Sequence, residues 1–285
     1  MRYMFIQSNK ADHTISKLCK TLNVSRSGYY DWLKRPLSTR AQFNAFLLTR
    51  IKSIHKQFRG VYGAVKTWIE LNKQGYTCGL NKVIKLRRDA GIVAKRVIRF
   101  KQIQSGKIRT KFAPNLLSQD FSADNRNTKW VSDTTFIPTR KGWLYLATVM
   151  DLFSRKIIGW AMSNKNDKKL VKAALQMAIK RRKPNSSVIC HSDQGAQYNS
   201  FEYKRLLTEN NMIQSMSRKG CCWDNAVAES FFNNIKNEMV WHNKFNCRDE
   251  AKTAIFDYIE IFYNRQRIHQ SLGYRTPNDF EQCVI

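Results

Sequence analysis

Hydrophobic positions in the first part of the chain recur three or four residues apart, which is the spacing of a helix that is buried on one face. In residues 12–35 (DHTISKLCKTLNVSRSGYYDWLKR), two short apolar stretches follow Thr14 and Ser25, and both residue types commonly cap helices. The pattern predicts two short helices joined by a tight turn at Asn23, with basic residues on the second. This arrangement is typical of a helix-turn-helix, and an ordinary helical hairpin is the alternative.

Helical spacing continues through residues 42–58, 64–73 and 82–89, with glycines between the predicted helices and Asn81 as a cap of the last. Basic side chains on these helices are candidates for contacts with phosphate, and a solvated helix face is the alternative for each of them. The candidates are Arg26 on the second helix of the chain and Lys82, Lys85, Arg87 and Arg88 on the last. Residues 101–125 are polar, basic and aperiodic, as expected of a linker.

Period-two alternation begins at residue 129 and indicates strands. Three strands at residues 130–137, 142–150 and 156–162 are expected to form an antiparallel meander. The predicted order continues with a helix at 168–182, a strand at 188–191, a helix at 201–210, a strand at 213–217 and a long helix at 225–240, capped by Asp224. The predicted segments of the chain are 1–40 (helix-turn-helix-like), 41–100 (helical, DNA-binding), 101–125 (basic linker) and 126–285 (catalytic core with a helical tail).

The order βββ-α-β-α-β-α describes an α/β core of the RNase-H-like type, with a mixed five-stranded sheet and flanking helices, preceded by an all-α region. In such a sheet the first and fourth strands are neighbours, so Asp133 and Asp193 are expected to converge. Glu229, on a helix that crosses this edge, completes the cluster. Thirty-five residues separate Asp193 from Glu229, and Lys236 follows Glu229 by seven residues, on the same helix face.

Three clustered carboxylates repel one another unless a cation lies between them. Oxygen ligands without Cys or His favour Mg²⁺ or Mn²⁺, and the interpretation is a site for two ions held by Asp133, Asp193 and Glu229. Each acid alone has a structural alternative: an edge position for Asp133, a turn for Asp193 and a solvated helix face for Glu229. Their joint spacing favours the metal-binding triad.

Several other residues in this half receive structural interpretations. Asp151 is expected in the turn between the second and third strands, and His191 is expected to be packed and hydrogen-bonded. Trp223, in the loop before the last helix, is a candidate for stacking on a DNA base. The predicted core tryptophans are Trp130, Trp143 and Trp160.

The net charge of the chain adds a nucleic-acid partner to the predicted metal site. The 285 residues carry a formal net charge of +29, while 42% of them are hydrophobic, so a folded protein with a polyanionic partner is indicated. Residues 1–120 hold 25 Lys and Arg against 5 Asp and Glu, a net charge of +20, and residues 121–285 hold 25 against 16, a net charge of +9. The basic front is therefore expected to attract DNA phosphate.

Cysteine usage and hydropathy argue against export. The seven cysteines form no CxxC pair and do not cluster with the five histidines, so neither a disulfide framework nor a zinc site is expected. No apolar run approaches the roughly 18 residues of a membrane span, and residues 1–10 have no signal-peptide core. These features indicate a cytoplasmic protein with reduced thiols.

The local strings resemble the DDE transposases of bacterial insertion sequences, the product of the second of two overlapping frames (OrfB-type), which are related to retroviral integrases. The matching strings are WVSDTT at 130–135, DLFSR at 151–155, HSDQG with QY at 191–198, DNA with ESFF at 224–232, and the tail motifs between Tyr263 and Pro277. Residues 59–63 and the helices around them resemble the helical module that precedes such cores. The resemblance covers nearly the whole chain.

The resemblance implies metal-dependent DNA cleavage and strand transfer of an insertion sequence, with Asp133, Asp193 and Glu229 as the triad and Lys236 on DNA near it. It also implies a bacterial, nucleoid-associated protein whose partners are element ends and target DNA, a homo-oligomer on DNA, and an upstream-frame protein as fusion or partner. The zinc module of the retroviral relatives has no equivalent cluster here. The alternatives are an RNase-H-like nuclease without strand transfer and a non-catalytic DNA-binding modulator of transposition.

Overall fold

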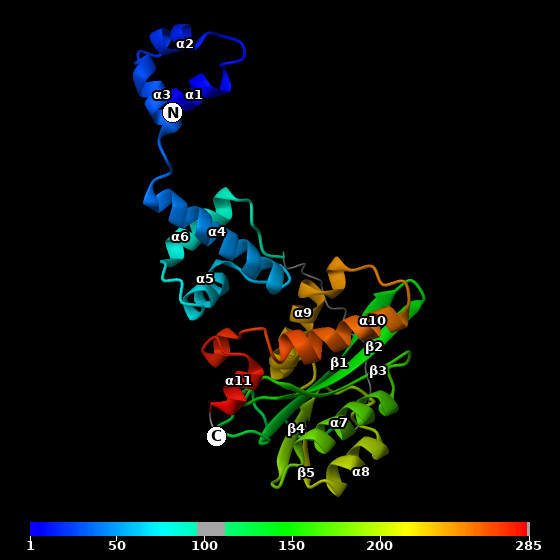
Figure 1. The fold of residues 1–285 in the computed structure, drawn as a ribbon. Helices are drawn as coiled ribbons and strands as arrows, with labels where there is room; N and C mark the ends of the chain where they lie inside the picture. Colours follow the sequence, from blue (N-terminus) through cyan, green and yellow to red (C-terminus); the bar gives the residue numbers. More distant parts are fainter. Residues whose placement is uncertain (96–111, 284–285) are drawn as a thin grey trace.

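The computed structural model describes residues 1–95 and 112–283, and Figure 1 shows three successive parts along the chain. The first is a small bundle of α1 (Arg2–Ser8), α2 (Ile15–Thr21) and α3 (Arg26–Lys34), which surrounds its own core of Ile6, Leu18, Cys19 and Tyr29. Thr14 and Ser25 cap α2 and α3 by accepting hydrogen bonds from backbone N–H groups three residues on, as predicted. Helix α1 was not predicted, because it buries only Ile6 and has no side-chain cap.

The second part packs directly on the third. Its helices are α4 (Thr39–Gln57), α5 (Ala64–Lys73) and α6 (Leu80–Asp89). Tyr62 stacks on Phe58 with 4.0 Å between ring centroids, donates a hydrogen bond to the carbonyl of Gln266 at 3.0 Å and accepts one from the N–H of Ile268 at 3.0 Å. One hydrophobic cluster therefore runs from α4–α6 into the C-terminal part of the chain.

The third part is built on a five-stranded sheet of order β3-β2-β1-β4-β5, which confirms the expected integrase-type core. The strands are β1 (Lys129–Thr139), β2 (Gly142–Asp151), β3 (Ile157–Ser163), β4 (Val188–Ser192) and β5 (Met212–Met216). The first three form an antiparallel meander, and β4 is parallel to both β1 and β5. Asp151, which was predicted in the turn after this strand, is instead the last residue of β2, opposite Trp130. It is fully buried and accepts a hydrogen bond from the Phe153 N–H in the turn.

Helices cover the two faces of the sheet. On one face lie α7 (Lys168–Arg182) and α8 (Phe201–Glu209), and on the other α9 (Ala226–Glu238) and α10 (Arg248–Phe256), as Figure 1 shows. The remaining elements are short 3₁₀ turns, η1 (Cys222–Asn225), η2 (Val240–His242) and η4 (Gln270–Leu272), a π-helical continuation of α10, η3 (Asp257–Tyr263), and the last helix α11 (Pro277–Gln282). The long helix predicted over 225–240 is thus shorter and flanked by 3₁₀ turns.

Three sequence-based expectations need correction. Arg87 does not face solvent with the other cations of α6, because it is buried and donates a hydrogen bond to Oγ1 of Thr67 at 2.9 Å. Gly79, and not Asn81, occupies the position before α6. Of the predicted core tryptophans, Trp130 is fully buried and Trp160 half-buried, but Trp143 is exposed beside the hairpin turn at residues 140–141.

The predicted linker lies partly outside the described residues, and its described end is packed. The N–H of Leu116 donates to Oγ of Ser215 at 2.9 Å, and the carbonyl of Pro114 accepts a hydrogen bond from the N–H of Met216 at 3.3 Å. This segment therefore lies alongside β5 in the fold. Among the described residues, no helix has the length and apolar character needed to cross a membrane.

Gly159 on β3 marks the closest approach of α7 to the sheet. A Cβ added there would lie 2.2 Å from the carbonyl oxygen of Ala174 and 2.7 Å from the backbone nitrogen of Ala178. Gly159→Ala is therefore expected to destabilise the fold by about 1–3 kcal/mol, because the helix must move away from the strand. Urea unfolding followed by circular dichroism measures the change.

The matched control for this prediction is Gly79→Ala. Gly79 has an ordinary backbone conformation and open space around its Cα, so this change is expected to cost about 0.5 kcal/mol or less. Equal stability losses for the two variants would contradict the close packing of α7 on β3.

Candidate active site

The sheet register brings Asp133 and Asp193 to the same level. β1 and β4 run parallel with Val131 opposite His191, and each aspartate lies two residues further along its chain. The ladder between the two strands ends at Val131, so β1 continues past β4 with its edge open on that side among the described residues. Both aspartates are half-buried at this point.

Glu229 reaches the same edge from the first turn of α9. The helix is held on the sheet by buried Phe231, Phe232 and Ile235. Just before it, the side-chain amide of Asn225 donates a hydrogen bond to the carbonyl of Ser132 at 3.4 Å. The start of the helix is therefore tied to β1 one residue before Asp133.

The three carboxylates act on one another electrostatically. Burial, and after it the charge of Asp193, raises the pKa of Asp133 well above its ordinary value, with a further contribution from Glu229. Burial raises the pKa of Asp193, and burial together with the charge of Asp193 raises the pKa of Glu229. The structure thus brings together the three acids predicted from their spacing, in an arrangement that a cation would stabilise.

The donor chemistry fits a hard divalent cation. Oδ1 of Asp133 accepts a hydrogen bond from the N–H of Thr134 at 2.7 Å, and Oδ1 of Asp193 accepts one from the N–H of Gly195 at 3.0 Å. The second oxygen of each carboxylate is left for a ligand. In the described ranges, however, no three His, Cys, Asp or Glu side chains are close enough to form a ready-made metal site. The carboxylates would have to close around an ion by side-chain rotation.

Lys236 lies two turns after Glu229 on α9, as its spacing predicted. Its Nζ lies 5.0 Å from the ring centroid of Phe136, and the charge of Asp133 acts on it. Burial lowers the pKa of Lys236, while Asp133 opposes that shift. The cation therefore stands beside the carboxylates, where it can meet a phosphate group.

Asp224 is not the predicted helix cap. Asn225 occupies that position, and the buried Asp224 carboxylate binds the loop before the helix instead. It accepts hydrogen bonds from the backbone N–H, Nε and Nη2 of Arg218 at 2.8–3.0 Å, and from Asn115 and Gln119 at 2.9 Å. The bonds from Arg218 hold the pKa of Asp224 far below its ordinary value. This residue fastens the described end of the predicted linker to the loop that leads into α9.

Asp224→Asn is expected to loosen this loop and to reduce stability by about 2 kcal/mol, because charge-assisted hydrogen bonds to a buried group are lost. Trypsin cleavage after Arg218, followed by mass spectrometry, should become faster. Asp249→Asn, at an exposed aspartate paired with Lys252, is the control and should change neither measurement. An unchanged cleavage rate in Asp224→Asn would contradict the anchoring role.

Two other residues of this region lie as expected. His191 is buried, with Nδ1 at 2.8 Å from Oγ of Ser215 and Nε2 at 3.2 Å from Oγ of Ser217, and burial lowers its pKa to about 4. Trp223 is 70% exposed in η1. Tyr198 was not singled out from the sequence, yet it is fully buried next to Asp133 and Asp193, whose charges add to the effect of burial in raising its pKa.

The remaining DNA-binding candidates lie away from the carboxylates. Arg26 is exposed at the start of α3, and Lys85 and Arg88 are exposed on α6, where Arg88 lies 3.7 Å from Asp89. Figure 1 places both helices in the first two parts of the chain, apart from the sheet. The structure therefore does not bring these cations to the triad.

Comparisons with known proteins agree with this architecture. Two models described as "Integrase core domain" match residues 123–222 and 229–285, and a model described as "HTH-like domain" matches residues 43–100. The HTH-like match thus covers α4–α6 and not the helix pair of residues 12–35 that the sequence pattern singled out.

Two curated relatives match nearly end to end. The chain is 40% identical to "Transposase InsF for insertion sequence IS3A" of Escherichia coli (strain K12) over 283 residues, covering 99% of this chain and 98% of the relative. It is 39% identical to "Insertion element IS600 uncharacterized 31 kDa protein" of Shigella sonnei over 265 residues, covering 93% and 97%.

Solved structures are more distant. The HTLV-2 integrase catalytic core domain in complex with magnesium (dimeric form) is 17% identical, with a TM-score of 0.41, covering 55% of this chain and 97% of that one. A chain of the simian T-cell lymphotropic virus intasome in complex with PP2A regulatory subunit B56 gamma is 14% identical, with a TM-score of 0.45, covering 75% and 70%.

Proposed function

This chain belongs to the family of insertion-sequence transposases with an integrase core domain, and from that premise we propose that it cleaves and joins DNA strands through Asp133, Asp193 and Glu229. The observation that carries the assignment of residues is the convergence of these three acids at the open edge of β1, where the charge of Asp193 acts on both Asp133 and Glu229. Carboxylates with a purely structural role are not expected to cluster at one edge of a sheet.

In this proposal Asp133, Asp193 and Glu229 would together hold the divalent cation, two Mg²⁺ or Mn²⁺ ions in all. When bound, the ions would stabilise the charge on the attacking and leaving oxygens of an in-line displacement. The residues of the chain position the phosphodiester, and Lys236 contacts a neighbouring phosphate. Water first attacks the phosphodiester at the element end, which releases a 3′-hydroxyl and leaves the phosphate on the other strand end. The 3′-hydroxyl then attacks a second phosphodiester and displaces the 3′-oxygen of the target strand. One diester replaces another, so no covalent protein intermediate is required.

DNA binding is supported by the HTH-like match to α4–α6 and by the net charge of +29. We further propose that Arg26, Lys85 and Arg88 contact phosphate, and that the chain acts as a homo-oligomer on element ends and target DNA, with an upstream-frame protein as fusion or partner. A cytoplasmic, nucleoid-associated location follows from this activity.

The test incubates the purified chain, alone and fused to the upstream-frame protein, with a labelled duplex that carries the terminal repeat of its element and Mg²⁺. Nicked and strand-joined products, separated on a denaturing gel, would support the proposal. Nicking without joining would indicate a nuclease of RNase-H type, and binding without cutting would indicate a modulator. Either of these outcomes would overturn strand transfer as the function.

A further inference from the structure

Two aromatic side chains lie exposed on the same side of the β1–β2 hairpin. Phe136 is 47% exposed and Trp143 is 49% exposed, although both stand on strands that are otherwise largely buried. Their ring centroids are 4.9 Å apart at an interplanar angle of 82°. An edge-to-face pair of this kind is fixed in place while parts of both rings remain open to solvent.

The aromatic pair lies near the candidate active site along the open edge of β1, although its rings project from the sheet face opposite to that of Asp133. Phe136 follows Asp133 by three residues on β1, which corresponds to roughly 10 Å along a strand. Lys236 bridges the two, because its Nζ lies 5.0 Å from the Phe136 ring centroid while the charge of Asp133 acts on it. No strand pairs with β1 beyond Val131 on the β4 side among the described residues, so a ligand can follow this edge from the carboxylates to the aromatic pair.

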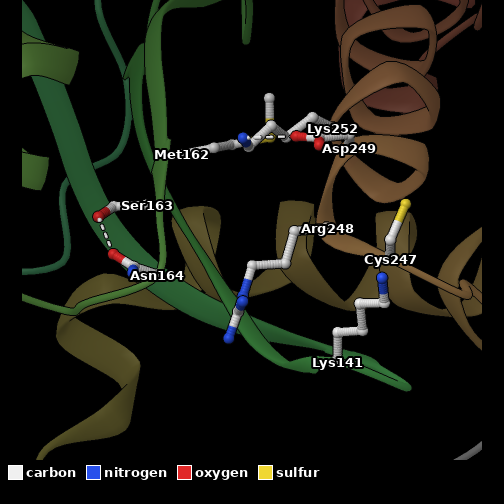
Figure 2. Close-up of a pocket in the computed structure, with 8 residues that line it drawn as sticks. All are labelled: Lys141, Met162, Ser163, Asn164, Cys247, Arg248, Asp249 and Lys252. Carbon is white, nitrogen blue, oxygen red and sulfur yellow. Dashed lines mark hydrogen bonds and ion pairs between the residues drawn. The ribbon is translucent and has the colours of Figure 1, made fainter.

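Further cations lie beside the same hairpin. A cleft of about 440 Å³ between the hairpin, the end of β3 and the start of α10 is lined by Lys141, Arg248 and Lys252. Figure 2 shows Arg248 extending from α10 toward the strands, and its Nε donates a hydrogen bond to the carbonyl of Trp143 at 3.0 Å. The only acid that lines the cleft in the described structure, Asp249, is paired with Lys252 at 2.8 Å. The hairpin that carries the aromatic pair is therefore flanked by positive charge on its α10 side.

We propose that Phe136 and Trp143 form a stacking platform for an unpaired base of the DNA strand that enters the active site, with Lys236 on the adjacent phosphate. The aromatic rings offer a face to any base, and the nearby cations match the charge of the backbone, which is the combination that binds single-stranded nucleic acid. The proposal rests on the proposed function for DNA as the substrate. It adds that the strand next to the scissile phosphate is unstacked on the protein.

The experiment compares a forked duplex, whose unpaired arm carries 2-aminopurine, with a fully paired duplex of the same sequence. All variants carry Glu229→Gln, so that binding is measured without cleavage. The parent protein should bind the fork more tightly and quench 2-aminopurine. Trp143→Ala should weaken fork binding by roughly 5- to 100-fold and abolish the quenching, while affinity for the paired duplex stays within about twofold.

Trp143→Tyr, which keeps an aromatic face, should restore most of the preference for the fork. Phe201→Ala removes a 73%-exposed aromatic ring from α8 and serves as the matched control, with no expected change. Equal losses for fork and duplex, unchanged quenching in Trp143→Ala, or a change of oligomeric state in place of a change in fork binding would each overturn the platform. Because no step requires cleavage, failure of the catalytic assay and failure of this one are distinguishable.

Discussion

Replacement of Glu229 by Gln is expected to abolish strand cleavage while DNA affinity stays within about twofold of the parent. The substitution keeps the size of the side chain but removes the negative charge that raises the pKa of Asp133. A carboxylate that helps to hold catalytic metal contributes several kcal/mol of transition-state stabilisation, which corresponds to a loss of about 10³-fold or more in rate. Cleavage of a labelled element end in Mg²⁺ gives the rate, and fluorescence anisotropy gives the affinity.

The control for this prediction is Glu209→Gln on α8. Glu209 is an exposed glutamate that pairs with Arg205 four residues earlier, so its loss should leave the cleavage rate unchanged. A Glu229→Gln protein that cuts at the parental rate would remove Glu229 from the triad. Loss of DNA binding in the same variant would indicate a structural role for Glu229 instead.

The second large effect is expected at Arg267. This side chain is buried and binds both carboxylate oxygens of Glu238, at the end of α9, through three hydrogen bonds of 2.7–3.0 Å. The hydroxyl of Tyr258 donates a further hydrogen bond to Glu238 at 2.7 Å. Arg267→Met leaves the carboxylate buried without its counter-charge, and a loss of about 3–5 kcal/mol in the free energy of unfolding is expected from urea denaturation.

A double-variant cycle separates this effect from simple loss of packing. Arg267→Met combined with Glu238→Met removes both charges, so the double variant is expected to be more stable than Arg267→Met alone. Arg205→Met at the exposed pair on α8 should cost about 1 kcal/mol or less. A double variant no more stable than the single one would mean that the buried pair is not the source of the loss.

The placement of Asp133 and Asp193 near one another could be predicted, because it depends on strand order and on the local sequence. Asp133 and Asp193 each lie two residues beyond a register pair of adjacent parallel strands, and strand order follows from the sequence of elements. The helix caps at Thr14 and Ser25 were also predictable, since a capping side chain bonds to the next turn of its own helix. Such interactions depend on neighbours in the chain.

Two predictions, for Asp224 and Arg87, were wrong because the hydrogen-bond partner of the side chain lies in another element of the chain. Asp224 was predicted to cap a helix. Its carboxylate instead accepts hydrogen bonds from Asn115 and Gln119, which lie more than a hundred residues earlier in the chain. Arg87 was predicted to be a surface cation, but its side chain is buried in the core and donates a hydrogen bond to Thr67. In both cases a polar residue is satisfied by tertiary contacts, which leave no periodic trace in the sequence.

The docking of α4–α6 on the tail of the core limits how such proteins can diversify. Tyr62 bonds to the backbone at Gln266 and Ile268, Arg59 pairs with Asp257 at 2.6 Å, and Nζ of Lys95 donates to the carbonyl of Glu238 at 2.6 Å. A recombinant that exchanged only the HTH-like segment for that of a relative would bring in a foreign face against these positions. If the HTH-like segment reads the element end, as proposed, a new specificity is expected to be inherited together with the tail residues that pack against that segment.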